Sequence, residues 1–289
     1  MKTIDLHVHS CHSDGSLTPK ELVELALKTG LSAFALTDHD TTGGIGEALL
    51  AAAGTKLEVV PGIEFSTRWL HRDIHILGYY LDYEADSFQQ KLREFLKDRD
   101  LRNHKMCARI QEYTGCPLSM EDLQNRFPKA VITRAHMAAW LVEKGFAATK
   151  NIAFDKYLGE HAPCFVPKSE VTPKDAIRLI LAHGGIPVLA HPLLYALSRK
   201  QLCLLVKELK EYGLLGIEAI YVLNRRAEET FCRSLAEEHG LLITGGSDFH
   251  GKNKPDIALG TGIRSNLSVS YSLLEGLKEA KRLNSSQES

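Results

Sequence analysis

Short apolar runs alternate with amphipathic helical patterns along most of the chain. Runs of this length between helical segments are typical of βα units and a largely parallel sheet, so we expect an α/β fold. Each run ends at or near a polar cluster. The runs are Thr3–Val8, Ala33–Thr37, Glu58–Val60, Ile74–Tyr80, Ile186–Ala190, Gly216–Ile220 and Leu241–Thr244.

Two of the intervening helices carry clear start signals. Thr18 has the residue type of an N-cap, Pro19 follows in the first turn, and Glu21 completes a capping box. Gly30 stands where this helix should end. Thr172–Asp175 repeats the same start, which predicts a second helix of this kind later in the chain.

The alternation of strands and helices disappears between about Asp86 and Val166. Helical patterns at Phe88–Tyr113 and Ala135–Lys144 fill this stretch. We therefore expect residues 86–165 to form a helical insertion between two parts of the α/β fold, residues 1–85 and 166–283. Residues 284–289 are polar, and we expect them to form a flexible tail.

The composition indicates an ordinary globular protein and does not by itself indicate a function. The chain has 289 residues, 44% hydrophobic and 25% charged, which are ordinary globular values. Its net charge is -1, so a site for a polyanion has to be local. No uninterrupted apolar stretch approaches the roughly 20 residues of a membrane helix. We expect a cytoplasmic protein without a membrane association, and six cysteines without a C-x-x-C pair favour reduced thiols.

Histidine and carboxylate residues gather at the ends of the expected strands. His7 and His9 are two residues apart, so they share one face of a strand. The carboxyl ends of strands assemble the sites of α/β sheets and barrels. One such histidine could be a core residue, but so many at one end predict a metal site. The other members are Asp14, His39, Glu64, His75, His191, Asp248 and His250.

The types of ligand indicate the chemistry. Carboxylates mixed with imidazoles, without thiolates, suit Mn²⁺, Fe²⁺ or Zn²⁺ rather than a structural zinc centre built on cysteine. Nine candidate ligands are more than one ion takes from protein, which implies two or three divalent ions and at least one bridging carboxylate. Adjacent cations lower the pKa of a shared water and hold the attacking and departing oxygens of a phosphate in line, so the predicted reaction is hydrolysis.

Together these motifs resemble the PHP (polymerase and histidinol phosphatase) family. They are His7-Val8-His9-Ser10 with Ser13-Asp14-Gly15, Thr37-Asp38-His39-Asp40, Pro61-Gly62-Ile63-Glu64, His75, Ala190-His191-Pro192 and Gly246-Ser247-Asp248-Phe249-His250. The resemblance implies a distorted (β/α)7 barrel, similar to a TIM barrel, with a trinuclear metal site at its C-terminal face.

The resemblance also implies how the ligands divide among the ions. It places His7, His9, Glu64 and Asp248 on one ion, Glu64, His75 and His191 on a second, and Asp14, His39 and His250 on a third. Asp14, His39, Asp248 and His250 are the predicted catalytic residues. The proton donor for the leaving group stays open among His39, His250 and water. Asp38 or Asp40 could orient His39, and Asp40 could instead cap the following helix.

The insertion between His75 and His191 is similar to the cap of a PHP subgroup of 3′,5′-nucleoside bisphosphate phosphatases, some of which also trim RNA from its 5′ end. Between Lys91 and Arg109 it has seven Lys or Arg and three Asp or Glu. Arginine offers a bidentate fork for phosphate, and helix starts favour anions. The predicted contacts to a second phosphate are Arg134, His136, Arg102 and Arg99; surface solubility and helix capping are the alternatives.

The predicted function is a metal-dependent phosphoesterase that removes a terminal phosphate from a small nucleotide, such as a nucleoside 3′,5′-bisphosphate, with short RNA as a further substrate. Manganese is the expected metal, and no obligate protein partner is expected. A histidinol-phosphate-type phosphatase, a DNA exonuclease and a catalytically silent metal-binding module are the alternatives. The insertion could also contact another chain through Leu92, Phe95, Leu96, Leu101 and Ile110.

Overall fold

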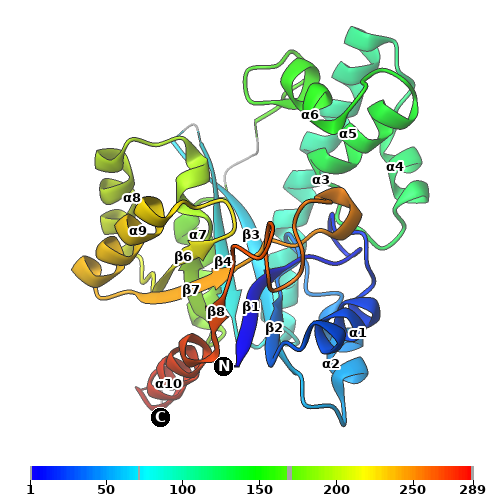
Figure 1. The fold of residues 1–289 in the computed structure, drawn as a ribbon. Helices are drawn as coiled ribbons and strands as arrows, with labels where there is room; N and C mark the ends of the chain where they lie inside the picture. The colour runs from blue at the N-terminus through cyan, green and yellow to red at the C-terminus, as the bar shows by residue number, and fades with distance from the viewer. Residues whose placement is uncertain (1, 71, 168–170, 288–289) are drawn as a thin grey trace.

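The computed structural model describes residues 2–70, 72–167 and 171–287. Eight strands in the order β7-β6-β5-β4-β3-β2-β1-β8 form one curved sheet that nearly closes into a barrel, because the segment after β7 returns to the end of β1 (Figure 1). The predicted α/β barrel class is confirmed. The strands are β1 Thr3–Val8, β2 Ala33–Leu36, β3 Glu58–Trp69, β4 Arg72–Tyr79, β5 Ile186–Leu189, β6 Gly216–Tyr221, β7 Leu242–Gly246 and β8 Val269–Ser270.

The sheet is less parallel than the sequence pattern predicts. The pairs β1–β2, β2–β3, β5–β6 and β6–β7 are parallel, whereas β4 runs antiparallel to both β3 and β5. The predicted run Glu58–Val60 is only the start of β3, which continues through Pro61 and Gly62 to Trp69 and pairs with β4 along its length. The short β8, antiparallel to β1, had no sequence signal.

Helices cover the outside of the sheet as the alternating pattern predicts. Helix α1 has the expected capping box between Thr18 and Glu21, and Gly30 ends it with φ +78°. The last helix continues to Gln287, so it includes part of the segment expected to be a flexible tail; residues 288–289 lie outside the described residues. The helices around the barrel are α1 Pro19–Thr29, α2 Ile45–Ala52, α7 Pro173–Ala182, α8 Arg199–Glu211, α9 Arg226–His239 and α10 Tyr271–Gln287.

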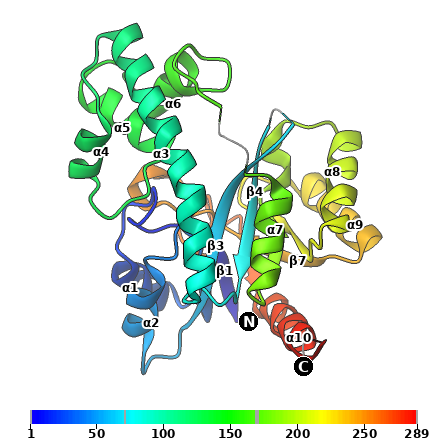
Figure 2. The same cartoon turned by 180° about the vertical axis from the view of Figure 1, so that it is seen from behind.

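The segment between β4 and α7 is helical and projects from the barrel (Figure 2). Its long first helix begins beside the sheet, where Phe88 and Leu92 join a core cluster of the barrel, and ends in a separate cluster that includes Met106 and Ile110. The elements are α3 Asp86–Thr114, α4 Met120–Arg126, α5 Arg134–Glu143, α6 Lys150–Ala153 and a π-helical turn, η1, at Phe154–Leu158. We call residues 86–165 the cap.

Most of the apolar residues that could have contacted another chain pack in the interior of this chain. Leu92 and Ile110 are buried, and Phe95 and Leu96 pack against the barrel cluster, whereas Leu101 is 63% exposed. These contacts favour the packing of the cap on its own barrel. Among the described helices, none combines the length and the apolar character needed to cross a membrane. All six cysteines are free.

Candidate metal centre

All the predicted ligands lie at one end of the barrel, and the reversed direction of β4 places His75 there with the others. His7 and His9 lie at the end of β1, and His39 follows β2 and bridges to Glu64 on β3. His75 lies near the start of β4, opposite Ser66, two residues beyond Glu64. Because β4 runs antiparallel, its beginning lies at the same edge of the sheet as the ends of its neighbours. The same edge receives the segments after β5 and β7.

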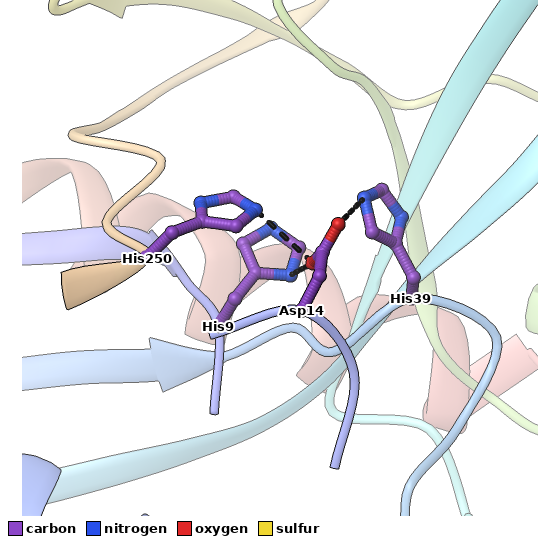
Figure 3. A group of neighbouring side chains, drawn as sticks. All are labelled: His9, Asp14, His39 and His250. Carbon is purple, nitrogen blue, oxygen red and sulfur yellow. Dashed lines mark ion pairs between the residues drawn. The ribbon is translucent and has the colours of Figure 1, made fainter. Parts of the chain in front are cut away.

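The nine predicted ligands form four overlapping groups in which the ligand atoms lie within 4.8 Å of one another. One group, drawn in Figure 3, surrounds Asp14, whose Oδ1 is 3.1 Å from His250 Nε2. The groupings overlap more than the predicted division among three ions, because His9 lies in the Asp14 group and His39 also lies beside Glu64. The groups are His9, Asp14, His39 and His250; His7, His9 and Asp248; His7, Glu64 and His191; and His39, Glu64 and His75.

Glu64 lies at the centre of the assembly and its two oxygens face different rings. Oε2 is 3.2 Å from Nε2 of both His7 and His9, and Oε1 is 2.8 Å from His75 Nδ1 and 3.0 Å from His191 Nε2. The side chain is 1% exposed. This arrangement fits the predicted bridging role, in which one carboxylate serves two cations.

Several ligand atoms in this cluster are buried without a hydrogen-bond partner among the described residues. They include Nε2 of His7, Nε2 of His9, Oδ1 of Asp14 and Oε2 of Glu64. Buried polar groups are normally satisfied, so unsatisfied donors and acceptors that converge on one place indicate a missing partner. Imidazole nitrogens and carboxylate oxygens suit divalent transition metals. The residues therefore fit a centre of two or three divalent ions.

The cluster favours charged carboxylates. Burial raises the pKa of Glu64, but the surrounding imidazoles, His39 first, outweigh it and hold the pKa well below its ordinary value. Burial likewise raises the pKa of Asp14, and His250 and His39 lower it further than burial raises it. Lys254 and the nearby histidines do the same for Asp248. Three carboxylates are thus kept negative in a buried place, which favours a cation.

The histidines divide into two kinds. Burial lowers the pKa of His39 well below its ordinary value and also lowers that of His250, which favours the neutral ring, the form that binds a metal. Burial also opposes protonation of His7 and His9, but carboxylates outweigh it, raising the pKa of His9 to about 9 and that of His7 well above its ordinary value. A cation entering beside His7 and His9 therefore replaces protons.

Strained backbone also marks the site. His191 has φ +22° and Asp248 has φ +55°, conformations that residues other than glycine rarely adopt. Such strain collects at functional sites, where the surrounding structure holds it.

The residues around the ligands were not all predicted. Asp248 Oδ2 accepts hydrogen bonds from the Tyr221 hydroxyl at 2.8 Å and from Lys254 Nζ at 2.6 Å. Glu218, buried on β6, contacts His7 Nδ1 at 3.0 Å and accepts from the backbone N–H of His191 at 2.8 Å. A single acidic residue inside the apolar run Gly216–Ile220 was a usable signal for Glu218, whereas Tyr221 and Lys254 stand in no recognisable motif.

Asp38 and Asp40 do not have the predicted roles in the described structure. Asp38 accepts hydrogen bonds from the Ser10 backbone N–H at 2.7 Å and from the Ser13 hydroxyl at 2.6 Å, so it fixes the loop after β1 rather than the His39 ring. Asp40 accepts from the Ser66 backbone N–H at 2.8 Å and pairs with Arg99. Helix α2 has Gly44 as its N-cap, which excludes Asp40 from capping it.

Arginines of the cap line cavities next to the ligand cluster. A cavity of about 410 Å³ is lined by ligands that include His39 and His191 and by Arg134 of α5. A smaller adjoining cavity of about 120 Å³ is lined by Asp14 together with Arg99, Arg102 and Arg134. Of the four predicted phosphate contacts, the structure therefore places three arginines beside the ligands.

Each of these arginines already has a hydrogen-bond or ion-pair partner in the protein. Arg134 Nη2 donates to Asp73 Oδ2 at 2.8 Å, and Arg99 pairs with Asp40. Arg102 is 4% exposed and donates to the Val166 carbonyl at 2.9 Å. Burial and the neighbouring arginines lower its pKa to about 9.

His136, the fourth predicted phosphate contact, has a structural role instead. It is 5% exposed, and its Nδ1 accepts a hydrogen bond from the Thr133 backbone N–H at 2.9 Å in the capping box of α5. Its ring lies 4.4 Å from that of Phe127. The capping alternative accounts for the position of this ring, because its Nδ1 is the acceptor in the capping box.

Comparison with known proteins agrees with this geometry. The PHP domain family matches residues 5–161. The chain is 36% identical over 248 residues to the 5′-3′ exoribonuclease Rnm of Escherichia coli, covering 85% of this chain and 84% of the relative. It is 33% identical over 253 residues to the 3′,5′-nucleoside bisphosphate phosphatase of Chromobacterium violaceum, covering 86% of this chain and 88% of the relative.

The fold also matches a solved structure. An amidohydrolase from Chromobacterium violaceum with bound sulfate has a TM-score of 0.84 and 31% identity, covering 96% of each chain. Together with the matching residues of the site, these findings show that the chain belongs to the PHP domain family.

Proposed function

We propose that this chain is a metal-dependent phosphoesterase that removes a terminal phosphate from nucleoside 3′,5′-bisphosphates and releases 5′ nucleotides from short RNA. The observation that carries the proposal is the cavity of about 410 Å³, which is lined both by residues of the ligand cluster and by Arg134. That volume is in the usual range of small-molecule sites. The two relatives, an exoribonuclease and a bisphosphate phosphatase, support both substrates.

The metal ions supply the Lewis acidity for hydrolysis of the phosphate ester when they are bound, and we propose manganese from the donor set. The nine ligands, His7, His9, Asp14, His39, Glu64, His75, His191, Asp248 and His250, would hold two or three such ions. The lowered pKa of His39 and of His250 favours neutral ligands over proton donors for both rings.

The cap arginines would hold the phosphate that is not cleaved. Arg134 lines both cavities, and its guanidinium lies 5.4 Å from the ring centroid of Phe165, which orients its plane. A second phosphate would compete with Asp73 for the fork of Arg134 and with Asp40 for Arg99. Arg102 is buried and also lines the smaller cavity, where it adds positive charge.

Three substrates separate the proposal from its rivals. Phosphate release is compared for adenosine 3′,5′-bisphosphate, histidinol phosphate and a short 5′-phosphorylated RNA in the presence of Mn²⁺. We expect the highest kcat/KM for the bisphosphate and measurable release of nucleotides from the RNA. A preference for histidinol phosphate would contradict the proposal, and no turnover of any substrate would favour a silent metal-binding module.

Replacing Arg134 by Met tests the role of the cap. A charge-assisted hydrogen bond contributes about 1.5–3 kcal/mol, so we expect KM for adenosine 3′,5′-bisphosphate to rise about 10- to 100-fold. A simple monoester such as p-nitrophenyl phosphate has no second phosphate, and its KM should change less than about threefold. The matched control is Arg126→Met, because Arg126 also lies in the cap but is exposed and paired with Glu143. Equal effects of Arg134→Met on both substrates would contradict the assignment.

A further inference from the structure

Glu218 is a buried acid outside the set of predicted ligands. Its side chain is 0% exposed, in the middle of β6 between Ile217 and Ala219. Burying a carboxylate is costly unless hydrogen bonds and opposite charge compensate it. The contacts of Glu218 therefore show what keeps it in the barrel.

Both oxygens of Glu218 face the ring of His7. Oε1 is 3.0 Å and Oε2 is 3.2 Å from His7 Nδ1. The other ring nitrogen, Nε2, is buried without a hydrogen-bond partner in the described residues and lies 3.2 Å from Glu64 Oε2. With Nδ1–H donated to Glu218, the lone pair of Nε2 points into the cluster.

The same carboxylate also holds a second ligand residue. Oε2 of Glu218 accepts a hydrogen bond from the backbone N–H of His191 at 2.8 Å. His191 has φ +22° and ψ 58°, a conformation that needs support from its surroundings. Glu218 thus connects His7 with His191, which are two members of one ligand group whose third member is Glu64.

We propose that Glu218 is a positioning residue of the metal centre, which fixes the ring of His7 and the backbone of His191 so that both imidazoles face one cation. Carboxylates that accept the second N–H of a metal-binding histidine set its tautomer, its orientation and its strength as a ligand. This inference rests on the metal centre of the proposed function and is independent of which nucleotide is the substrate.

The isosteric variant Glu218→Gln removes one of the two acceptor oxygens. Because both oxygens of Glu218 lie within 3.2 Å of His7 Nδ1, the NH₂ group of the amide places a donor against Nδ1–H in either orientation. We expect the affinity of the metal-free protein for Mn²⁺, measured by competition with a chelator, to fall about 10- to 100-fold. Glu218→Ala should lower it at least as much.

Thr244→Val is the matched control. Thr244 lies directly beside Glu218 on the neighbouring strand β7 and is also fully buried, but no ligand residue is among its hydrogen-bond partners in the described structure. Its replacement by Val should leave the affinity for Mn²⁺ within about threefold of the original protein. Circular dichroism checks that each metal-free variant is folded, and if Glu218→Ala does not fold, the isosteric Gln variant decides the question.

The two possible failures differ in outcome. If Glu218→Gln binds Mn²⁺ within threefold of the original protein, Glu218 has only a structural role and the inference is overturned, while the metal centre stands. If the original protein itself binds no Mn²⁺, Zn²⁺ or Fe²⁺, the metal centre on which the proposed function depends is wrong.

Discussion

At the scale of single residues, His136 shows how a capping hydrogen bond and burial together favour one protonation state of a ring. Nδ1 of His136 accepts from the Thr133 backbone N–H, so a proton on that atom would place two donors face to face. Burial is the largest influence on this ring and lowers the pKa of His136 to about 4. In the unfolded chain the same ring has a pKa near 6.5.

This difference predicts a loss of stability in mild acid. Between pH 6.5 and pH 4 the unfolded chain binds the proton that the folded His136 refuses, so the contribution of His136 is complete above pH 6.5 and is lost as the pH falls. From pH 7 to pH 5 we expect about 2 kcal/mol of unfolding free energy to be lost through this residue. The measurement is denaturant unfolding of the original protein and of His136→Gln at both pH values.

Other groups titrate in the same pH interval. The test therefore compares how much unfolding free energy the original protein and His136→Gln each lose between pH 7 and pH 5. His136→Gln should be less stable at pH 7 but lose less between pH 7 and pH 5. Parallel losses would show that the imidazole of His136 is not neutral in the folded cap.

At the scale of elements, the contact between β7 and β1 shapes the metal centre. Gly246 ends β7 against His7 of β1, and a Cβ built on Gly246 would lie 2.5 Å from His7 Cβ and 2.6 Å from its backbone nitrogen. Real atoms do not approach so closely, so a side chain here must push apart the strands that carry His7 and, two residues beyond Gly246, Asp248.

We expect Gly246→Ala to destabilise the protein by about 1–3 kcal/mol, the usual cost of overpacking, and to reduce the bound metal. The control is Gly46→Ala, because Gly46 lies in helix α2 with no atom within 4 Å of its added Cβ. That change should stabilise by roughly 0.5–1 kcal/mol, since alanine is the better helix former. Thermal unfolding and metal analysis measure both; a harmless Gly246→Ala would mean that β1 and β7 can separate freely.

The elements also show what sequence patterns can and cannot predict. The caps of α1 were predictable because Thr18, Glu21 and Gly30 act through local contacts. The reversal of β4 was not, because a strand direction depends on which neighbour it pairs with, and the pattern of Ile74–Tyr80 is the same in either direction. His75 was still predicted as a ligand, because the sequence analysis grouped it with the residues at strand ends; it lies near the start of β4 instead, and the reversal of β4 places it with the others.

At the scale of the whole molecule, ligand residues from both sides of the cap meet in one cluster. Their types and their positions at strand ends made them predictable from sequence. Glu218, Tyr221 and Lys254 were missed because their roles follow from contacts across the barrel, such as that of Lys254 with Asp248. The same reason explains Asp73, whose contact with Arg134 joins β4 to the cap. Long-range partners of this kind leave no spacing in the chain.

Removal of metal should therefore affect the stability of the whole barrel. The candidate ligands lie on or beside β1, β2, β3, β4, β5 and β7, so ions held by them would bind the folded chain and not the unfolded one. A single ion present at 100 times its dissociation constant stabilises the folded state by about 2.7 kcal/mol. For a chain of this size, that corresponds to a rise in Tm of roughly 5 °C, and a second ion should add to it.

Thermal unfolding after treatment with a chelator, and again after addition of Mn²⁺, measures this effect. We expect chelation to lower Tm and abolish phosphate release, and Mn²⁺ to restore both. Glu64→Gln is the decisive comparison, because the two oxygens of Glu64 face five candidate ligand histidines, and the variant should show little rise in Tm with Mn²⁺. A chelated protein that keeps full activity and the same Tm would contradict the metal centre, since the cluster would then be stable and active through its own ion pairs alone.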